Sequence, residues 1–146
     1  MEKKYLKYGF GIAGTMIAYF LILKLIGLHE YPILSAVNGI IMGAGIFYAL
    51  RAYKRKTENF KYEIGFQLGL VTGGIASFVF VLFMAIYIFY IDEQFALIIL
   101  DSWNLKFDNG TQILLFSLFI MSFTSCLILT LTFMQLLKEN MNPKKK

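Results

Sequence analysis

Residues 64–91 read IGFQLGLVTGGIASFVFVLFMAIYIFYI, a stretch without a single charged side chain. About 20 helical residues cross the roughly 30 Å hydrocarbon core of a bilayer, so this stretch is long enough to span a membrane. Three further apolar runs are Gly9–Leu28, Ile33–Leu50 and Gln112–Leu137. Because the backbone groups of a segment in lipid must be satisfied within that segment, each run is expected to be an α-helix. The sequence therefore predicts four transmembrane helices.

The composition leads to the same class. Of the 146 residues, 58% are hydrophobic and 16% are charged, and the mean hydropathy is +0.66. An average soluble domain is about 45–50% apolar and about 25% charged. The length suits one domain over residues 1–146, and the apolar composition excludes a nucleic-acid module despite the net charge of +5. We expect an all-α membrane protein with four transmembrane helices in an up-down bundle.

Basic residues gather at one set of span ends. Twelve of the 14 Lys and Arg residues lie before the first run, between the second and third, or after the fourth, whereas Lys106 lies in an opposite loop and Lys24 within the first run. Short loops rich in Lys and Arg stay in the cytoplasm. Both termini and the loop between the second and third runs are therefore expected to be cytoplasmic. These cations either bind anionic lipid headgroups or only set the topology, and their spread over three segments favours the second interpretation.

A cleaved signal peptide is the alternative for the first run, because Lys3, Lys4 and Lys7 precede it. Its apolar stretch is longer than the usual core of 7–15 residues, and residues 28–32 (LHEYP) lack a small-x-small cleavage site. We expect this run to remain in the protein as a span.

Small residues at four-residue spacing mark faces for helix packing, because they let two helix backbones approach closely in lipid. They are Gly39 and Gly43 in the second run, and Gly65, Gly69, Gly73 and Ser77 in the third. Residues 78–90 are bulky on every face. We therefore expect the helices to lie close together near the cytoplasm and further apart on the other side. The sequence leaves open whether the partner helix belongs to this chain or to another copy.

Polar residues of the fourth run share about one third of the helix circumference. They are Ser117, Thr124, Ser125, Thr132 and Gln135. One interpretation is a polar wall that lines a path for a solute. The other is that the hydroxyls bond to their own backbone or to a neighbouring helix, which is common in packed spans. Met121 and Ile128 interrupt the stripe and favour the second interpretation.

The residues needed for catalysis or metal binding do not cluster in the sequence. His29 is the only histidine and Cys126 the only cysteine, whereas a zinc site usually gathers three or four ligands. Residues 9–14 (GFGIAG) match the dinucleotide fingerprint in letters, but a basic tail precedes them where that motif requires a strand. We expect no catalytic residues, no metal, no cofactor and no enzymatic activity.

The second outer loop, residues 91–111, carries Phe95, Ile98 and Ile99 at helical spacing among polar residues. This pattern predicts a short amphipathic helix along the membrane surface. It is either an ordinary lid on the bundle or a docking surface, and amphipathicity alone favours the lid.

Several short motifs resemble those of a known family over nearly the whole chain. They are residues 38–43 (NGIIMG), 51–54 (RAYK), 60–62 (FKY) leading to Gly65, Gly69 and Gly73, 90–92 (YID) with Phe95, and 133–135 (FMQ). The chain resembles small inner-membrane proteins from Bacteroidota catalogued as domain of unknown function 4199. The resemblance implies a four-span inner-membrane protein, with no activity to transfer.

We expect a structural or accessory subunit of a membrane complex or a homo-oligomer, surrounded by the lipid bilayer and without a nucleic-acid partner. The alternative is a channel or transporter for a small solute, lined by the hydroxyl stripe of the fourth run.

Overall fold

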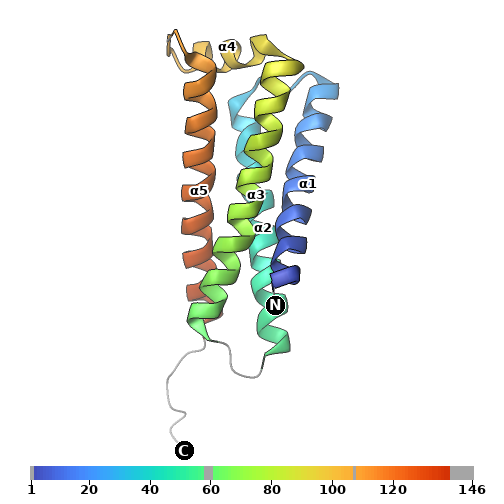
Figure 1. Ribbon diagram of the computed structural model, residues 1–146, viewed down its shortest axis with the longest axis vertical. Helices are drawn as coiled ribbons and strands as arrows, with labels where there is room; N and C mark the ends of the chain where they lie inside the picture. The colour runs from blue at the N-terminus through green and yellow to red at the C-terminus, as the bar shows by residue number, and fades with distance from the viewer. Residues whose placement is uncertain (1, 58–60, 107, 139–146) are drawn as a thin grey trace, which may run out of the picture.

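The structure is a computed structural model that describes residues 2–57, 61–106 and 108–138, which form five α-helices and no strand. Four long helices lie side by side, and a short helix crosses one end of them (Figure 1). The helices are α1 (Glu2–Ile26), α2 (Pro32–Lys56), α3 (Tyr62–Tyr90), α4 (Glu93–Ser102) and α5 (Gly110–Leu137). All but α4 contain a stretch that is long and apolar enough to cross a membrane. The predicted all-helical fold with four candidate spans is thus confirmed.

The second helix is longer than its apolar run. Pro32 occupies the first turn of α2. Backbone N–H groups in the first turn have no partner within the helix, so the missing N–H of proline costs no hydrogen bond there. At the other end α2 continues beyond Leu50 to Lys56 and carries Lys54, Arg55 and Lys56 in its last turn. Cations at this position interact favourably with the negative end of the helix dipole. Residues 51–56, which include these basic side chains, therefore continue the α2 helix beyond its apolar run.

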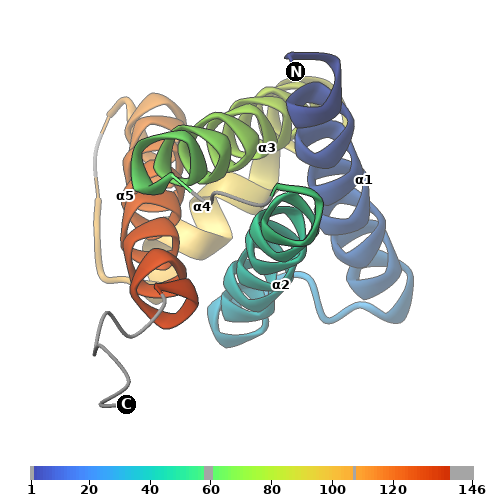
Figure 2. The ribbon, with the colours of Figure 1, turned by 90° about the horizontal axis from the view of Figure 1, so that it is seen from below.

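The two ends of the bundle differ in charge. The start of α1, the end of α2, the start of α3 and the end of α5 lie at the end opposite α4 (Figure 1), the end seen in Figure 2. The structure thus brings Lys7 of α1, the basic last turn of α2, Lys61 and Lys138 toward this end. The link between α1 and α2 lies at the α4 end, together with Asp92 and Asp101.

Close contacts of small residues hold α3 against α5. A Cβ atom added to Gly69 would lie 2.5 Å from Thr130 Cγ2, one added to Gly73 would overlap Cys126 Sγ, and the Ser122 hydroxyl donates to Ser77 Oγ over 2.8 Å. The three pairs are Gly69–Thr130, Gly73–Cys126 and Ser77–Ser122, so residue numbers rise by four along α3 while they fall by four along α5. We call these three contacts the glycine interface. They show that the partner of the third run's stripe, in which Gly65 is also buried, belongs to the same chain.

The other small residues have different surroundings. On α2, a Cβ added to Gly43 would lie 3.3 Å from Leu129 Cδ2, so this leucine would have to shift by a few tenths of an ångström to admit it. Gly45 faces Ile12 of α1 with no room for a methyl group. Gly39 has no atom within 4 Å of an added Cβ, so the structure places it beside open space.

Candidate binding chamber

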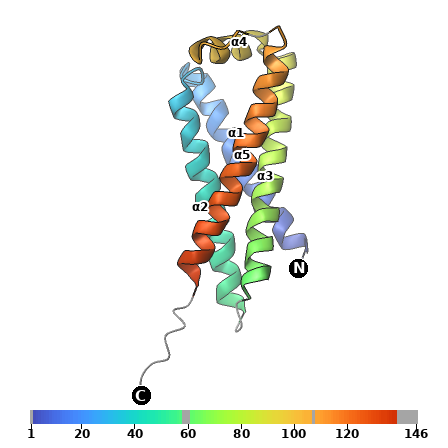
Figure 3. The same cartoon turned by 90° about the vertical axis from the view of Figure 1, so that its left-hand side faces the viewer.

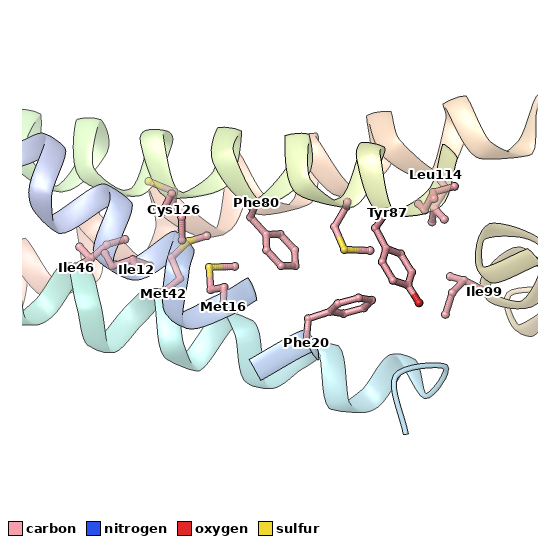
Figure 4. Packing of buried hydrophobic residues seen from close by; sticks show 14 of the residues in the cluster. Ile12, Met16, Phe20, Met42, Ile46, Phe80, Tyr87, Ile99, Leu114 and Cys126 are labelled. Carbon is pink, nitrogen blue, oxygen red and sulfur yellow. The ribbon is translucent and has the colours of Figure 1, made fainter. Parts of the chain in front are cut away.

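A cavity of about 440 Å³ lies beneath α4, and its lining residues come from all five helices. We call it the chamber. Met16 and Phe20 of α1, Met42 of α2 and Phe80 of α3 project into the space between the helices (Figure 4). Ligand sites in proteins usually occupy about 300–1,000 Å³ and have mainly apolar walls. The chamber therefore has the size and the lining of a site for a small apolar molecule.

The roof of the chamber is α4. Its first turn is capped by Asp92, whose Oδ1 accepts a hydrogen bond of 3.1 Å from the backbone N–H of Phe95. Phe95 and Ile99 are buried on the side facing the bundle, whereas Leu97 is 62% exposed on the other side. The helix at 93–102 is thus amphipathic, with its apolar face over the chamber.

An aromatic cluster closes one side of the chamber under this roof. The Phe20 ring meets Tyr87 edge-on with 4.9 Å between centroids, and it meets Phe95 in the same way at 5.7 Å. His29 stacks on Phe95 at 5.5 Å with an angle of 10° between the rings. It reaches this position because α1 ends at Ile26 and Gly27, with φ +77, turns the chain. Such offset and edge-to-face pairs are the favourable arrangements for aromatic rings.

Polar groups surround the cluster at the α4 end. The Tyr87 hydroxyl donates to Asp92 Oδ2 over 3.2 Å, and His29 Nε2 lies 3.7 Å from the same oxygen, beyond hydrogen-bond distance. The Lys24 Nζ atom lies 4.5 Å from the centroid of the Tyr87 ring, in a cation–π contact. Asp92 therefore connects the end of α3 to the start of α4, and His29 lies beside it.

Sequence reasoning missed this group. His29 and Asp92 come from two different links, and no spacing along the chain relates them. The available signal was their shared position at the predicted outer edge of the membrane. The Lys24 ammonium lies at this same end, over the Tyr87 ring.

Two polar side chains of the chamber wall have buried atoms that lack a hydrogen-bond partner among the described residues: His29, at both ring nitrogens, and Asn38. Asn38 of α2 is only 6% exposed, and its Oδ1 accepts no hydrogen bond from the described part of the chain. Ser122 and Ser125 of α5 also line the chamber. Buried carbonyl oxygens are hydrogen-bonded in the great majority of cases, so the free acceptor of Asn38 is an exception that requires an explanation.

The chamber opens sideways between α2 and α5. These helices are in contact away from α4, where the Phe47 and Phe133 rings lie 5.2 Å apart and Lys54 Nζ donates to the Leu137 carbonyl over 2.8 Å. Toward α4 they diverge (Figure 3). There Gly39 faces open space and Met121, on the α5 side, is 58% exposed. A molecule from the surrounding bilayer can thus reach the chamber from the side.

The residues of the predicted polar path do not converge. Thr124, Thr132 and Gln135 are exposed on the outer surface of the bundle, and the Thr132 hydroxyl donates to the Ile128 carbonyl of its own helix over 2.8 Å. Ser125 lines the chamber, and Ser117 is partly buried. In the ranges that the structure describes, these five side chains do not enclose a continuous polar passage.

Within the described ranges no three His, Cys, Asp or Glu side chains are placed to hold a metal ion. The neighbours of Cys126 are small residues of α3, and its thiol lies 3.8 Å from the carbonyl oxygens of Gly69 and Leu70. The chamber offers a mainly apolar enclosed shape, which suits binding.

Comparison with known proteins places the whole bundle in one family. No curated protein and no solved structure matches the chain. A family model with the description Protein of unknown function (DUF4199) matches residues 7–139, which include most of α1 and all of the other helices. This match covers far more than half of the chain and confirms the resemblance seen in its motifs. The chain belongs to the DUF4199 family of proteins of unknown function.

Proposed function

We propose that the chain is a multi-pass protein of a bacterial inner membrane, without a catalytic site, that serves as a structural or accessory subunit of a homo-oligomer or a larger membrane complex. The observation that carries the proposal is that polar side chains within the spans are in contact with a neighbouring helix of the same chain. Ser122, Cys126 and Thr130 of α5 are in contact with α3 in the glycine interface. These three polar side chains of α5 thus take part in helix packing.

The arrangement of the hydroxyl stripe favours this proposal over a channel for small solutes. A channel requires polar side chains that face an enclosed passage, whereas Thr124 and Thr132 face outward. The hydrogen bond from Thr132 to its own helix is the usual arrangement of a hydroxyl in a packed span.

The proposed orientation has both termini and the α2–α3 link in the cytoplasm, where the basic end meets the anionic headgroups of the inner leaflet. We expect an impermeant maleimide to label an Asp101→Cys variant on intact cells whose outer membrane has been made permeable. It should label an Arg55→Cys variant only after lysis. Both positions are exposed, and the native Cys126 is fully buried and serves as a silent background. The reverse labelling pattern would overturn the orientation.

The accessory role is tested by probing one lipid-facing position on each span with a photo-crosslinking phenylalanine analogue. The positions are Gly14 of α1, Ile40 of α2, Phe78 of α3 and Phe116 of α5, all exposed in the single chain. If a second subunit covers one face, that face should give an adduct of defined protein mass and the other faces lipid adducts. Native mass spectrometry should then show the same fixed stoichiometry. Lipid adducts from all four faces, together with a single-chain mass, would contradict the proposal.

A further inference from the structure

We propose that the chamber binds one acyl chain of a bilayer phospholipid, which enters sideways between α2 and α5 while its headgroup stays outside at the membrane surface. The inference rests on the four long apolar helices crossing a membrane. It does not depend on the accessory role, because every wall residue belongs to a single chain.

The chamber is long and narrow. Its wall extends from Pro32 to Met42 on α2 and from Leu114 to Ser125 on α5, about 15 Å along each helix at the usual rise of 1.5 Å per residue. The volume of about 440 Å³ spread over this length leaves a mean cross-section of about 30 Å². An extended hydrocarbon chain fills such a space in single file and leaves no room for a second chain beside it.

The volume and the side chains also suit a hydrocarbon chain. An apolar cavity of about 150 Å³ holds one benzene molecule, and the chamber has about three times that volume. Methionines from three helices, Met16, Met42 and Met84, line it. Their unbranched, flexible side chains adapt to irregular apolar shapes. The chamber can therefore take up a large part of one acyl chain.

The wall is apolar where a ligand would touch it. Among the described residues it includes no Lys, Arg, Asp or Glu side chain. His29 and Asn38 belong to the wall, but both ring nitrogens of His29 and the Asn38 Oδ1 atom are covered by surrounding atoms and are not presented to a ligand. A charged headgroup inside would lose its hydration without an ion-pair partner, which is strongly unfavourable. The headgroup therefore remains outside.

The mouth of the chamber lies between Ala36 and Gly39 of α2 and Met121 of α5, which all belong to its wall. Ala36 is exposed, Met121 is 58% exposed, and an added Cβ on Gly39 meets nothing within 4 Å. The roof, in contrast, is closed by the buried Phe95 and Ile99. Since the mouth faces the hydrocarbon region, the groups that stand in front of it are acyl chains.

The first measurement maps the side chains that the lipid touches. The purified protein is placed in nanodiscs of a phosphatidylcholine that carries a photoreactive diazirine either near the carbonyl carbon or at the end of one acyl chain, and peptide mass spectrometry locates the adducts. Ile99 in the roof and Met42 at the far end of the chamber are 7% and 2% exposed, so lipid around the bundle does not reach them (Figure 4). We expect the first probe to label Ile99 and the second to label Met42.

Two results would overturn the proposal. Adducts restricted to exposed side chains such as Phe116 would show that the chamber is closed to lipid, which would leave it to a small free molecule. Labelling of Ile99 and Met42 in the same ratio by both probes would also contradict it, because a chain held along the chamber places its two ends at different depths.

Variants at the mouth test the route of entry. Ala36→Leu and Gly39→Leu place larger side chains across the mouth, so each should lose the Met42 adduct and keep the Phe116 adduct. Gly14→Leu on the lipid-facing side of α1 is the matched control and should keep both, since an added Cβ there also meets nothing within 4 Å. Circular dichroism establishes that each variant is folded. A folded Ala36→Leu/Gly39→Leu double variant that retains the Met42 adduct would refute entry between α2 and α5.

Discussion

Gly73→Leu should prevent the protein from folding, whereas Gly74→Leu, at the next position of the same helix, should leave it folded. A Cβ atom on Gly73 already overlaps Cys126 Sγ and lies 2.9 Å from Ile46 Cδ1, while one on Gly74 meets nothing within 4 Å. Leucine at residue 73 would push α3 away from α5 and separate the Ser77–Ser122 hydrogen bond as well. Overpacking by a few methylenes costs about 1–3 kcal/mol, and a forced separation of two helices costs more.

The measurement is unfolding by sodium dodecyl sulfate titration from mild detergent, followed by circular dichroism. A graded version uses Gly73→Ala, for which we expect a loss of about 1–3 kcal/mol in the free energy of unfolding. Adding Cys126→Gly to Gly73→Ala should recover part of this loss, because it removes the sulfur that the new methyl group meets, and neighbouring sites are coupled. If Gly73→Leu proved as stable as Gly74→Leu, the glycine interface would be wrongly assigned.

Phe20→Ala should cause the second-largest loss, about 2 kcal/mol in the free energy of unfolding. The Phe20 ring is 6% exposed and meets Tyr87, Phe95, Phe83 and His29. In lipid the transfer of an apolar side chain contributes little, since the surroundings are also apolar. The cost of the new cavity remains, at about 24 cal/mol per Å³. The Tyr87 ring and α4 should lose their fixed positions, which near-ultraviolet circular dichroism reports.

Phe78→Ala is the control for this prediction. Phe78 lies on α3, is 61% exposed and faces the lipid, so its removal should change the free energy of unfolding by less than about 0.5 kcal/mol. Equal effects of the two substitutions would show that the aromatic cluster does not hold the α4 end together.

The sequence predicted the helices well because hydrophobic length alone identifies a span. Residues 64–91 and 112–137 correspond closely to α3 and α5. The prediction placed the end of the second span at Leu50, six residues before the end of α2, because the basic residues there are polar yet favourable in a last helical turn. Polarity was thus a poor guide to where this helix ends.

The helix that packs against the α3 glycines could not be predicted from the sequence. Four-residue spacing indicates which face of α3 is in contact with a neighbour, but it does not identify that neighbour. Gly69 and Thr130 are brought together by the course of the whole chain. The chamber was missed for the same reason. It results from the divergence of α2 and α5 toward α4, and sequence periodicity carries no information on the angle between two helices. Asn38 is one of the residues that line the space that this divergence leaves.

The short length of α4 has a consequence for how the chamber exchanges its contents. Isolated helices below about 12–15 residues are marginal in water, and α4, Glu93–Ser102, is shorter than that. It is helical because Phe95, Ala96, Ile99 and Leu100 rest on the bundle. Lifting this segment as a rigid flap would remove the contacts that keep it coiled, so it would melt as it left. Passage through the top therefore requires local unfolding, whereas passage from the membrane plane requires only that side chains change rotamer.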